Sequence, residues 1–117
     1  MGKKTVQNRA LSVKQPFAEQ IMTGKKKIEY RSVPTDKRER VYIYATKSPR
    51  KDVLKKLGKK PSDYSLGVII GTVEIVSCKW KNGEYQWGLA NPQRLKKPQK
   101  PDGQPMPVWF KPFKDKK

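Results

Sequence analysis

The absence of histidine restricts the chemistry that this chain of 117 residues can perform. Without histidine there is no Ser-His-Asp triad, no histidine general base and no histidine-containing zinc site. Cys78 is the only cysteine, so neither an intrachain disulfide nor a cysteine zinc site is available. We therefore expect no metal, no cofactor and an inert buried thiol at Cys78, in a reducing, cytoplasmic environment. Any catalysis would have to use Lys, Glu, Asp, Tyr, Ser, Thr or this cysteine.

Three charged residues at short spacing, Lys26, Glu29 and Arg31, follow Gly24 and are the first candidates for a site. Ion pairs among such residues can stabilise a fold without any further function. The same residue types can also hold a ligand, because Arg and Lys bind phosphate or carbonyl oxygen and a carboxylate accepts hydrogen bonds from amino groups. The sequence leaves both interpretations open.

The expected strand around these residues predicts where their side chains point. Successive side chains of a strand alternate between its faces, so Glu29 and Arg31 share one face and Ile28 and Tyr30 share the other. We expect Ile28 and Tyr30 in the core. Lys26 has the same parity, but a small core cannot hold an unpaired lysine. It must therefore lie in the turn before the strand begins or point into a polar cleft.

Positive charge dominates the composition, with 28 Lys and Arg against 10 Asp and Glu and a formal net charge of +18. A compact body with this charge repels itself, and a polyanion would neutralise it while releasing counterions. Lysine-rich surfaces can serve solubility, but thermophile surfaces usually pair Lys with Glu, and acids are scarce here. No amphipathic anchor helix and no membrane-spanning apolar run is visible. We expect a nucleic-acid partner, no membrane contact and a monomer.

Hydrophobic periodicity and turn residues predict a mixed set of short elements. The expected strands are residues 10–13, 27–31, 41–45, 66–78, 85–90 and 108–113. The expected helices are a short one that begins at Pro16 and closes at Gly24, and a lysine-coated one within 47–60 that ends at Gly58. Gly71 indicates a bulge or a close backbone approach, Asn82-Gly83 a hairpin turn, and residues 96–107 an extended loop.

These elements fit one domain, residues 6–113, with basic flexible ends at 1–5 and 114–117, and no repeat or linker interrupts it. One or two helices with five or six short strands predict an α+β fold, a small mixed β-barrel with flanking helices.

Several motifs, taken in order, resemble the ASCH domain family of the PUA-like superfamily, whose pattern is Gly-x-Lys-x-x-Glu-x-Arg after a helix. The matching residues are Gln15, Pro16, Phe17, Gly24, Lys26, Glu29, Arg31, Asn91, Pro92, Gly103 and Trp109. Together they extend over nearly the whole chain. The resemblance implies a barrel of five or six strands and a cleft, between barrel and helix, that the motif lines.

The resemblance also implies functions. Relatives in the superfamily bind RNA, some bind DNA, and several hold a modified base in the cleft. One bacterial relative hydrolyses the acetyl amide of N4-acetylcytidine with the motif lysine, which implies a catalytic Lys26. This chain has Glu29 where that relative has threonine, and the later helix that supplies a glutamate there is absent, which puts this activity in doubt. ASCH modules in transcription coactivators imply a third alternative, a protein-interaction domain.

The leading expectation is a module that binds RNA as single strands or loops, with a cleft for an ordinary or modified base. Single-stranded DNA is the other nucleic acid considered. The enzymatic alternative is an amidohydrolase on acetylated cytidine, or a ribonuclease, with Lys26 and Glu29 as catalytic residues. The expected nucleic-acid-binding residues are Lys14, Gln15, Phe17, Lys25, Lys26, Lys27, Glu29, Arg31, Lys47, Arg50, Lys51, Trp87, Asn91 and Arg94.

We predict different roles for the aromatic residues of the second half of the chain. Trp87 and Tyr85 are candidates to stack a splayed base. Trp80 and Trp109 are expected in the wall of the barrel, because large aromatic residues are usually mostly buried.

Overall fold

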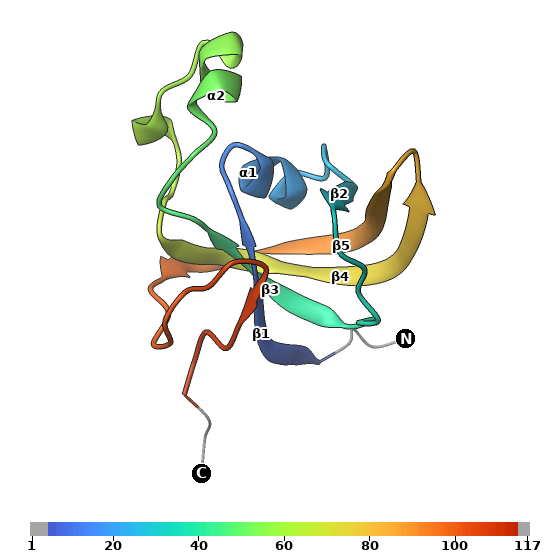
Figure 1. The fold of residues 1–117 in the computed structure, drawn as a ribbon. Helices are drawn as coiled ribbons and strands as arrows, with labels where there is room; N and C mark the ends of the chain where they lie inside the picture. The colour runs from blue at the N-terminus through green and yellow to red at the C-terminus, as the bar shows by residue number, and fades with distance from the viewer. Residues whose placement is uncertain (1–4, 115–117) are drawn as a thin grey trace.

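The computed structural model describes residues 5–114, which form one curled sheet with helices above it (Figure 1). Within this part of the chain the sheet has six strands in the order β2-β5-β4-β3-β1-β6. The strands are β1 (Val6–Val13), β2 (Ile28–Arg31), β3 (Arg40–Ala45), β4 (Val68–Lys81), β5 (Glu84–Gln99) and β6 (Trp109–Phe110). β1 and β3 are parallel and the other pairs antiparallel. This half-barrel confirms the expected α+β class. Of the two basic ends, residues 1–4 and 115–117 lie outside the described part.

The long β4–β5 hairpin forms the centre of the sheet. Asn82 and Gly83 have φ angles of 55° and 82° and make the two-residue turn that the sequence predicts. The expected end of β5 at residue 90 was wrong, because the strand continues to Gln99, which pairs with Ile69 of β4. β2 pairs with residues 85–88 alone, so the rest of β5 has a free edge and tolerates prolines.

Apolar side chains pack on both faces of the sheet. On the face under α1 (Phe17–Met22), Leu11, Trp87 and the helix residue Ile21 belong to the larger cluster. On the other face, Tyr44 and Phe110 belong to a smaller cluster and meet edge to face, with ring centroids 5.2 Å apart. Both clusters hold residues of β1 and β3, so these strands are buried on both sides and fix the position of the pocket that lies at their ends.

Gly71 lies where α1 and β5 approach β4 most closely. A Cβ atom at this position would collide with the sulfur of Met22 and the carbonyl oxygen of Gln93. The pairing register also shifts here, because Ile43 pairs with Gly71 while Tyr44 pairs with Ile69. The predicted bulge and the close backbone approach are therefore both present.

Gln15 and Gly24 define the two ends of α1. The Oε1 atom of Gln15 accepts a hydrogen bond from the backbone N–H of Glu19 at 2.9 Å, and its Nε2 donates to the carbonyl oxygen of Ser65 at 3.0 Å. Gly24 follows the helix with a φ of 80°, which is the left-handed C′ conformation expected there. Gln15 is thus buried and hydrogen-bonded within the fold, and it does not line the pocket described below.

The second helix, α2 (Lys51–Leu57), stands away from the sheet (Figure 1). It lies within the predicted range of 47–60, and Gly58 ends it with a φ of 69° as expected. Leu54 is its one buried residue, so most of its lysines face solvent. A short 3-10 helix at Pro61–Asp63 leads back toward β4. No helix within residues 5–114 is long and apolar enough to cross a membrane.

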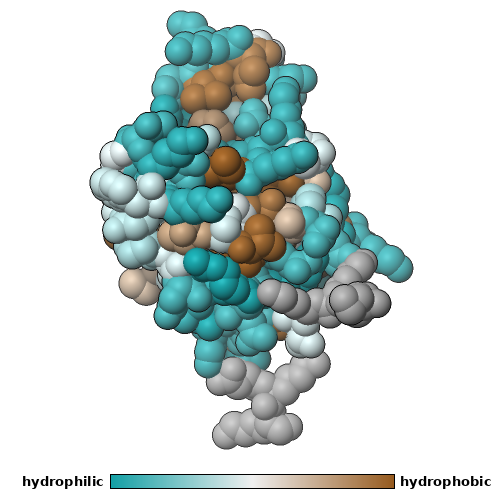
Figure 2. Space-filling view, turned by 90° about the vertical axis from the view of Figure 1, so that its right-hand side faces the viewer, coloured by the Kyte–Doolittle hydropathy of each residue, from teal (hydrophilic) through white to brown (hydrophobic). Residues whose placement is uncertain are grey.

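Two aromatic residues expected inside the protein lie outside. Tyr30 is 48% exposed, because β2 turns Glu29 and Arg31, not Ile28 and Tyr30, toward the interior of the half-barrel. Trp80 is 62% exposed, because it lies near the end of the β4–β5 hairpin beyond the core. Figure 2 shows a mostly hydrophilic face with apolar residues gathered near its middle.

Candidate nucleic-acid interface

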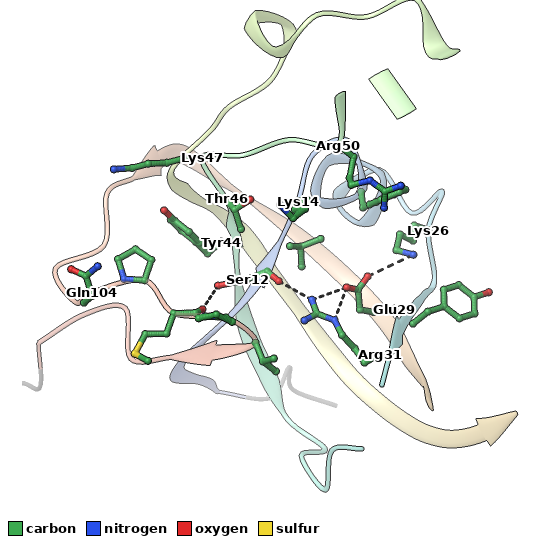
Figure 3. Close-up of a pocket in the computed structure, with 17 residues that line it drawn as sticks. Ser12, Lys14, Lys26, Glu29, Arg31, Tyr44, Thr46, Lys47, Arg50 and Gln104 are labelled. Carbon is green, nitrogen blue, oxygen red and sulfur yellow. Dashed lines mark hydrogen bonds and ion pairs between the residues drawn. The ribbon is translucent and has the colours of Figure 1, made fainter. Parts of the chain in front are cut away.

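A pocket of about 900 Å³ opens at the ends of β1 and β3, beside β2 and α1. Its lining residues are Ser12, Val13, Lys14, Phe17, Lys26, Glu29, Tyr30, Arg31, Tyr44, Thr46, Lys47, Arg50 and residues 104–108. Figure 3 shows Lys26, Glu29 and Arg31 on one side and the loop that carries Gln104 on the other. The volume lies in the range of small-molecule sites and is sufficient for a nucleotide.

Glu29 is the centre of the charged wall. Its Oε2 accepts a hydrogen bond from the Nε atom of Arg31 at 2.9 Å and forms an ion pair with the Nη2 atom of the same residue at 2.7 Å. Its Oε1 lies 3.6 Å from the Nζ atom of Lys26. All three side chains are mostly buried. The strand alternation predicted for Glu29 and Arg31 is confirmed, and the pocket lies open beside the cluster.

Arg31 also closes the interior of the half-barrel. Its Nη2 donates to the carbonyl oxygen of Ser12 at 2.7 Å, which links β2 to β1 across the concave side. Its guanidinium lies 5.8 Å from the ring centroid of Trp87. Trp87 in turn stacks on Trp109 of β6 at 5.7 Å. Arg31 is therefore held in place from three directions before any ligand arrives.

Lys26 lies in the turn before β2, as the parity argument requires. Its backbone N–H donates to the carbonyl oxygen of Gln20 at 2.9 Å. Its ammonium lies 5.2 Å from the ring centroid of Phe17 and 5.0 Å from that of Tyr30. Cation–π attraction and the Glu29 carboxylate thus hold the ammonium between two rings at the pocket wall.

Three further basic residues surround the upper rim. Lys14 donates to the carbonyl oxygen of Ser48 at 3.3 Å, and Lys47 is exposed at the mouth. Arg50 holds Asp52 with two hydrogen bonds of 2.9 and 3.0 Å. Those hydrogen bonds lower the pKa of Asp52 to about 2 and raise that of Arg50. Asp52 therefore remains ionised and competes with any phosphate for Arg50.

The wall opposite the charged cluster is apolar and comes from residues that the sequence analysis did not select. Pro105, Met106 and Val108 lie in the loop before β6, and Ser12 fixes this loop twice. The Ser12 hydroxyl donates to the carbonyl oxygen of Met106 at 2.7 Å, and its backbone N–H donates to that of Val108 at 2.9 Å. Val108 has a φ of 63°, an unfavourable conformation for a β-branched residue.

The structure brings together half of the residues predicted for binding. The predicted residues that line the pocket are Lys14, Phe17, Lys26, Glu29, Arg31, Lys47 and Arg50. Lys27 and Asn91 instead line a smaller hollow of about 250 Å³ on the other side of Lys26. Lys25 and Lys51 are exposed and do not line either hollow.

Two predicted residues serve the fold. Trp87 is 0% exposed and donates from Nε1 to the carbonyl oxygen of Val33 at 3.1 Å, so it cannot stack a base. Tyr85, the other residue predicted to stack a base, packs against the same core. Arg94 forms two hydrogen bonds of 2.7 and 2.9 Å with Glu19, which tie β5 to α1.

The sequence contains a signal for only some of the lining residues that were not predicted. Tyr30 belongs to the motif segment and was assigned to the core by parity alone. Ser12 lies three residues before the matched Gln15 but has no charge that would single it out. Residues 104–108 lie more than 70 positions from the motif, so their contact with it depends on the pairing of β6 with β1.

The curled mixed sheet and the helix over its concave face have the arrangement of a PUA-like fold, and the charged cluster lies on and just before β2. A model of the ASCH domain matches residues 11–100, and the chain belongs to this family. The fold is similar to the crystal structure of a serine-to-alanine mutant of ZmASCH from Zymomonas mobilis. That similarity has a TM-score of 0.62 at 16% sequence identity and covers 94% of this chain and 89% of the other. No curated protein matches the chain by sequence.

Proposed function

We propose that the protein binds single-stranded RNA, or an RNA loop, with an unpaired base in the pocket and the adjacent phosphates on its rim. One observation carries the proposal. Among the described lining residues there are five cationic side chains and a single carboxylate, Glu29, and two of the five already neutralise it. Of the remaining three, Arg50 is paired with Asp52, so Lys14 and Lys47 give the mouth its net positive charge, which favours phosphate.

Different residues of the pocket wall suit different parts of the ligand. Phe17 and Tyr30 offer ring surfaces to a base. The Oε1 atom of Glu29 has only the longer Lys26 contact, so it can accept a hydrogen bond from an exocyclic amino group. A base can enter a pocket of this kind only after it leaves its stack, which favours single strands and loops over duplex. Family membership favours RNA over DNA.

The test is a salt titration of binding, measured by fluorescence anisotropy with a labelled single-stranded RNA and with matched DNA and duplex. The logarithm of affinity should fall linearly with the logarithm of salt concentration. Lys47→Ala should weaken binding and reduce the slope by about 0.7, the value for one phosphate on a single strand. Lys96→Ala removes the same charge from exposed β5, outside the pocket, and should have the smaller effect. A flat salt dependence, or no binding at low salt, refutes the proposal.

The geometry favours binding over catalysis at Lys26. The Lys26 ammonium lies among a carboxylate and two ring faces, which hold it where it can donate a hydrogen bond to a ligand in the pocket. Incubation with N4-acetylcytidine and with single-stranded RNA tests this directly. Release of cytidine, or RNA cleavage that disappears in Lys26→Ala, would replace the binding proposal with an enzymatic one.

A further inference from the structure

The end of the β4–β5 hairpin, outside the pocket, carries an exposed aromatic pair. Trp80 of β4 is opposite Tyr85 of β5, and their rings meet at 63° with centroids 4.8 Å apart. Tyr85 packs against the core, so it holds Trp80 in position. Trp80 is nevertheless 62% exposed, which no packing requirement of the fold explains. The hairpin end is thus a fixed aromatic surface that faces solvent.

The charges around Trp80 indicate what this surface contacts. Lys79 and Lys81 flank it in β4, and both are exposed. Neither forms an ion pair with any of residues 5–114. Side chains alternate along a strand, so these two lysines leave the face of the hairpin opposite Trp80, and only their long, flexible ends can reach phosphates on either side of a base stacked on the ring. The net charge of +18 disfavours a basic protein partner at the same place.

The hairpin end is connected to the pocket through the sheet. Tyr85 pairs with Trp80 on one side and with Arg31 on the other. Trp80 therefore lies two strands from Arg31, which at the usual strand spacing is about 10 Å across the sheet. Arg31 lines the pocket. A strand that leaves the pocket can reach Trp80 within a few nucleotides.

We propose that the end of the β4–β5 hairpin, centred on Trp80, is a second nucleic-acid contact that stacks a base of the same strand, a few nucleotides away from the base in the pocket. This inference rests on the proposed function. It predicts that affinity depends on the length of the ligand, because a short oligonucleotide fills the pocket without reaching the hairpin.

The test compares an RNA dinucleotide with an octanucleotide on the full chain. Trp80→Ala should weaken octanucleotide binding about fivefold or more and leave dinucleotide binding unchanged. Trp80→Phe, which keeps a ring, should lose less. Val76→Ala is the matched control, because it shortens another exposed apolar side chain of β4 whose neighbours, Ile75 and Ser77, are uncharged. Trp80 is the most exposed tryptophan, so the octanucleotide should also quench a component of the emission that Trp80→Phe lacks.

The outcomes separate this inference from the proposed function. If Lys47→Ala weakens both ligands while Trp80→Ala weakens neither, the pocket stands and the hairpin proposal is overturned. If Trp80→Ala weakens both ligands equally, the hairpin is not a separate contact and the proposal is again overturned. If no variant changes the affinity of either ligand, both proposals fail together.

Discussion

Replacement of Glu29 by Gln tests the charged wall of the pocket most directly. The substitution keeps the shape of the side chain and removes the carboxylate that Arg31 contacts at 2.7 Å and Lys26 at 3.6 Å. Loss of one partner of a fully buried ion pair costs about 3–5 kcal/mol. The side chains here retain some exposure, so we expect a smaller loss, about 1–3 kcal/mol, in the free energy of unfolding. Urea unfolding followed by tryptophan fluorescence measures it.

The same substitution should act in the opposite direction on non-specific binding. Glutamine raises the charge of the pocket by one, so affinity for an oligouridine, which has no exocyclic amino group, should stay or rise. Preference for oligocytidine or oligoadenosine over oligouridine should fall about fivefold, the effect of about 1 kcal/mol from one lost acceptor. Competition anisotropy with the three oligonucleotides measures both changes.

Asp36→Asn is the control for charge, because Asp36 is an exposed residue outside the pocket and its loss changes the net charge equally. If Glu29→Gln lowers stability but keeps the base preference, Glu29 belongs to a structural ion-pair cluster alone. If it changes neither stability nor preference, the reasoning about this wall is refuted.

Three further substitutions test other parts of the structure. Asp52→Asn frees Arg50 from its two hydrogen bonds and should raise RNA affinity in the anisotropy assay, whereas unchanged affinity would show that Arg50 does not reach phosphate. Val108→Gly should raise the free energy of unfolding by about 1 kcal/mol, because glycine adopts the φ of 63° without strain, and a decrease would mean that the valine side chain contributes more than its conformation costs. Gly71→Ala should lower it by about 2 kcal/mol or more through collision with Met22, and near-wild-type thermal stability would contradict the close approach at this point.

The elements near the motif could be predicted because local residues determine them. Gly24 ends α1, Asn82-Gly83 makes the hairpin turn, and the alternation in β2 places Glu29 beside Arg31. The face of β2 that turns inward could not be predicted in the same way. Alternation fixes which residues share a face, but the curl of the whole sheet decides that the face of Tyr30 is the outer one.

The two tryptophans of the hairpin illustrate the same limit. Trp80 and Trp87 lie in paired strands, yet one is 62% exposed and the other is 0% exposed. The difference is their distance from the turn, since the hairpin extends beyond the core and only its inner part is covered by Trp109. No local sequence pattern indicates how far a hairpin extends beyond the elements that cover it.

The structural role of the charged cluster and the binding role that we propose for it cannot be separated by position, because Arg31 would serve both. Its bonds to Glu29 and to the carbonyl oxygen of Ser12 hold β2 against β1, and Ser12 in turn holds the apolar loop at Met106. One continuous set of hydrogen bonds thus links the two walls of the pocket. A change at Arg31 should therefore alter the apolar wall as well as the charged one, whereas a change at Lys47 on the rim should alter the charge of the mouth alone. The contrast between these two positions shows why rim lysines, not motif residues, are the right probes of phosphate binding.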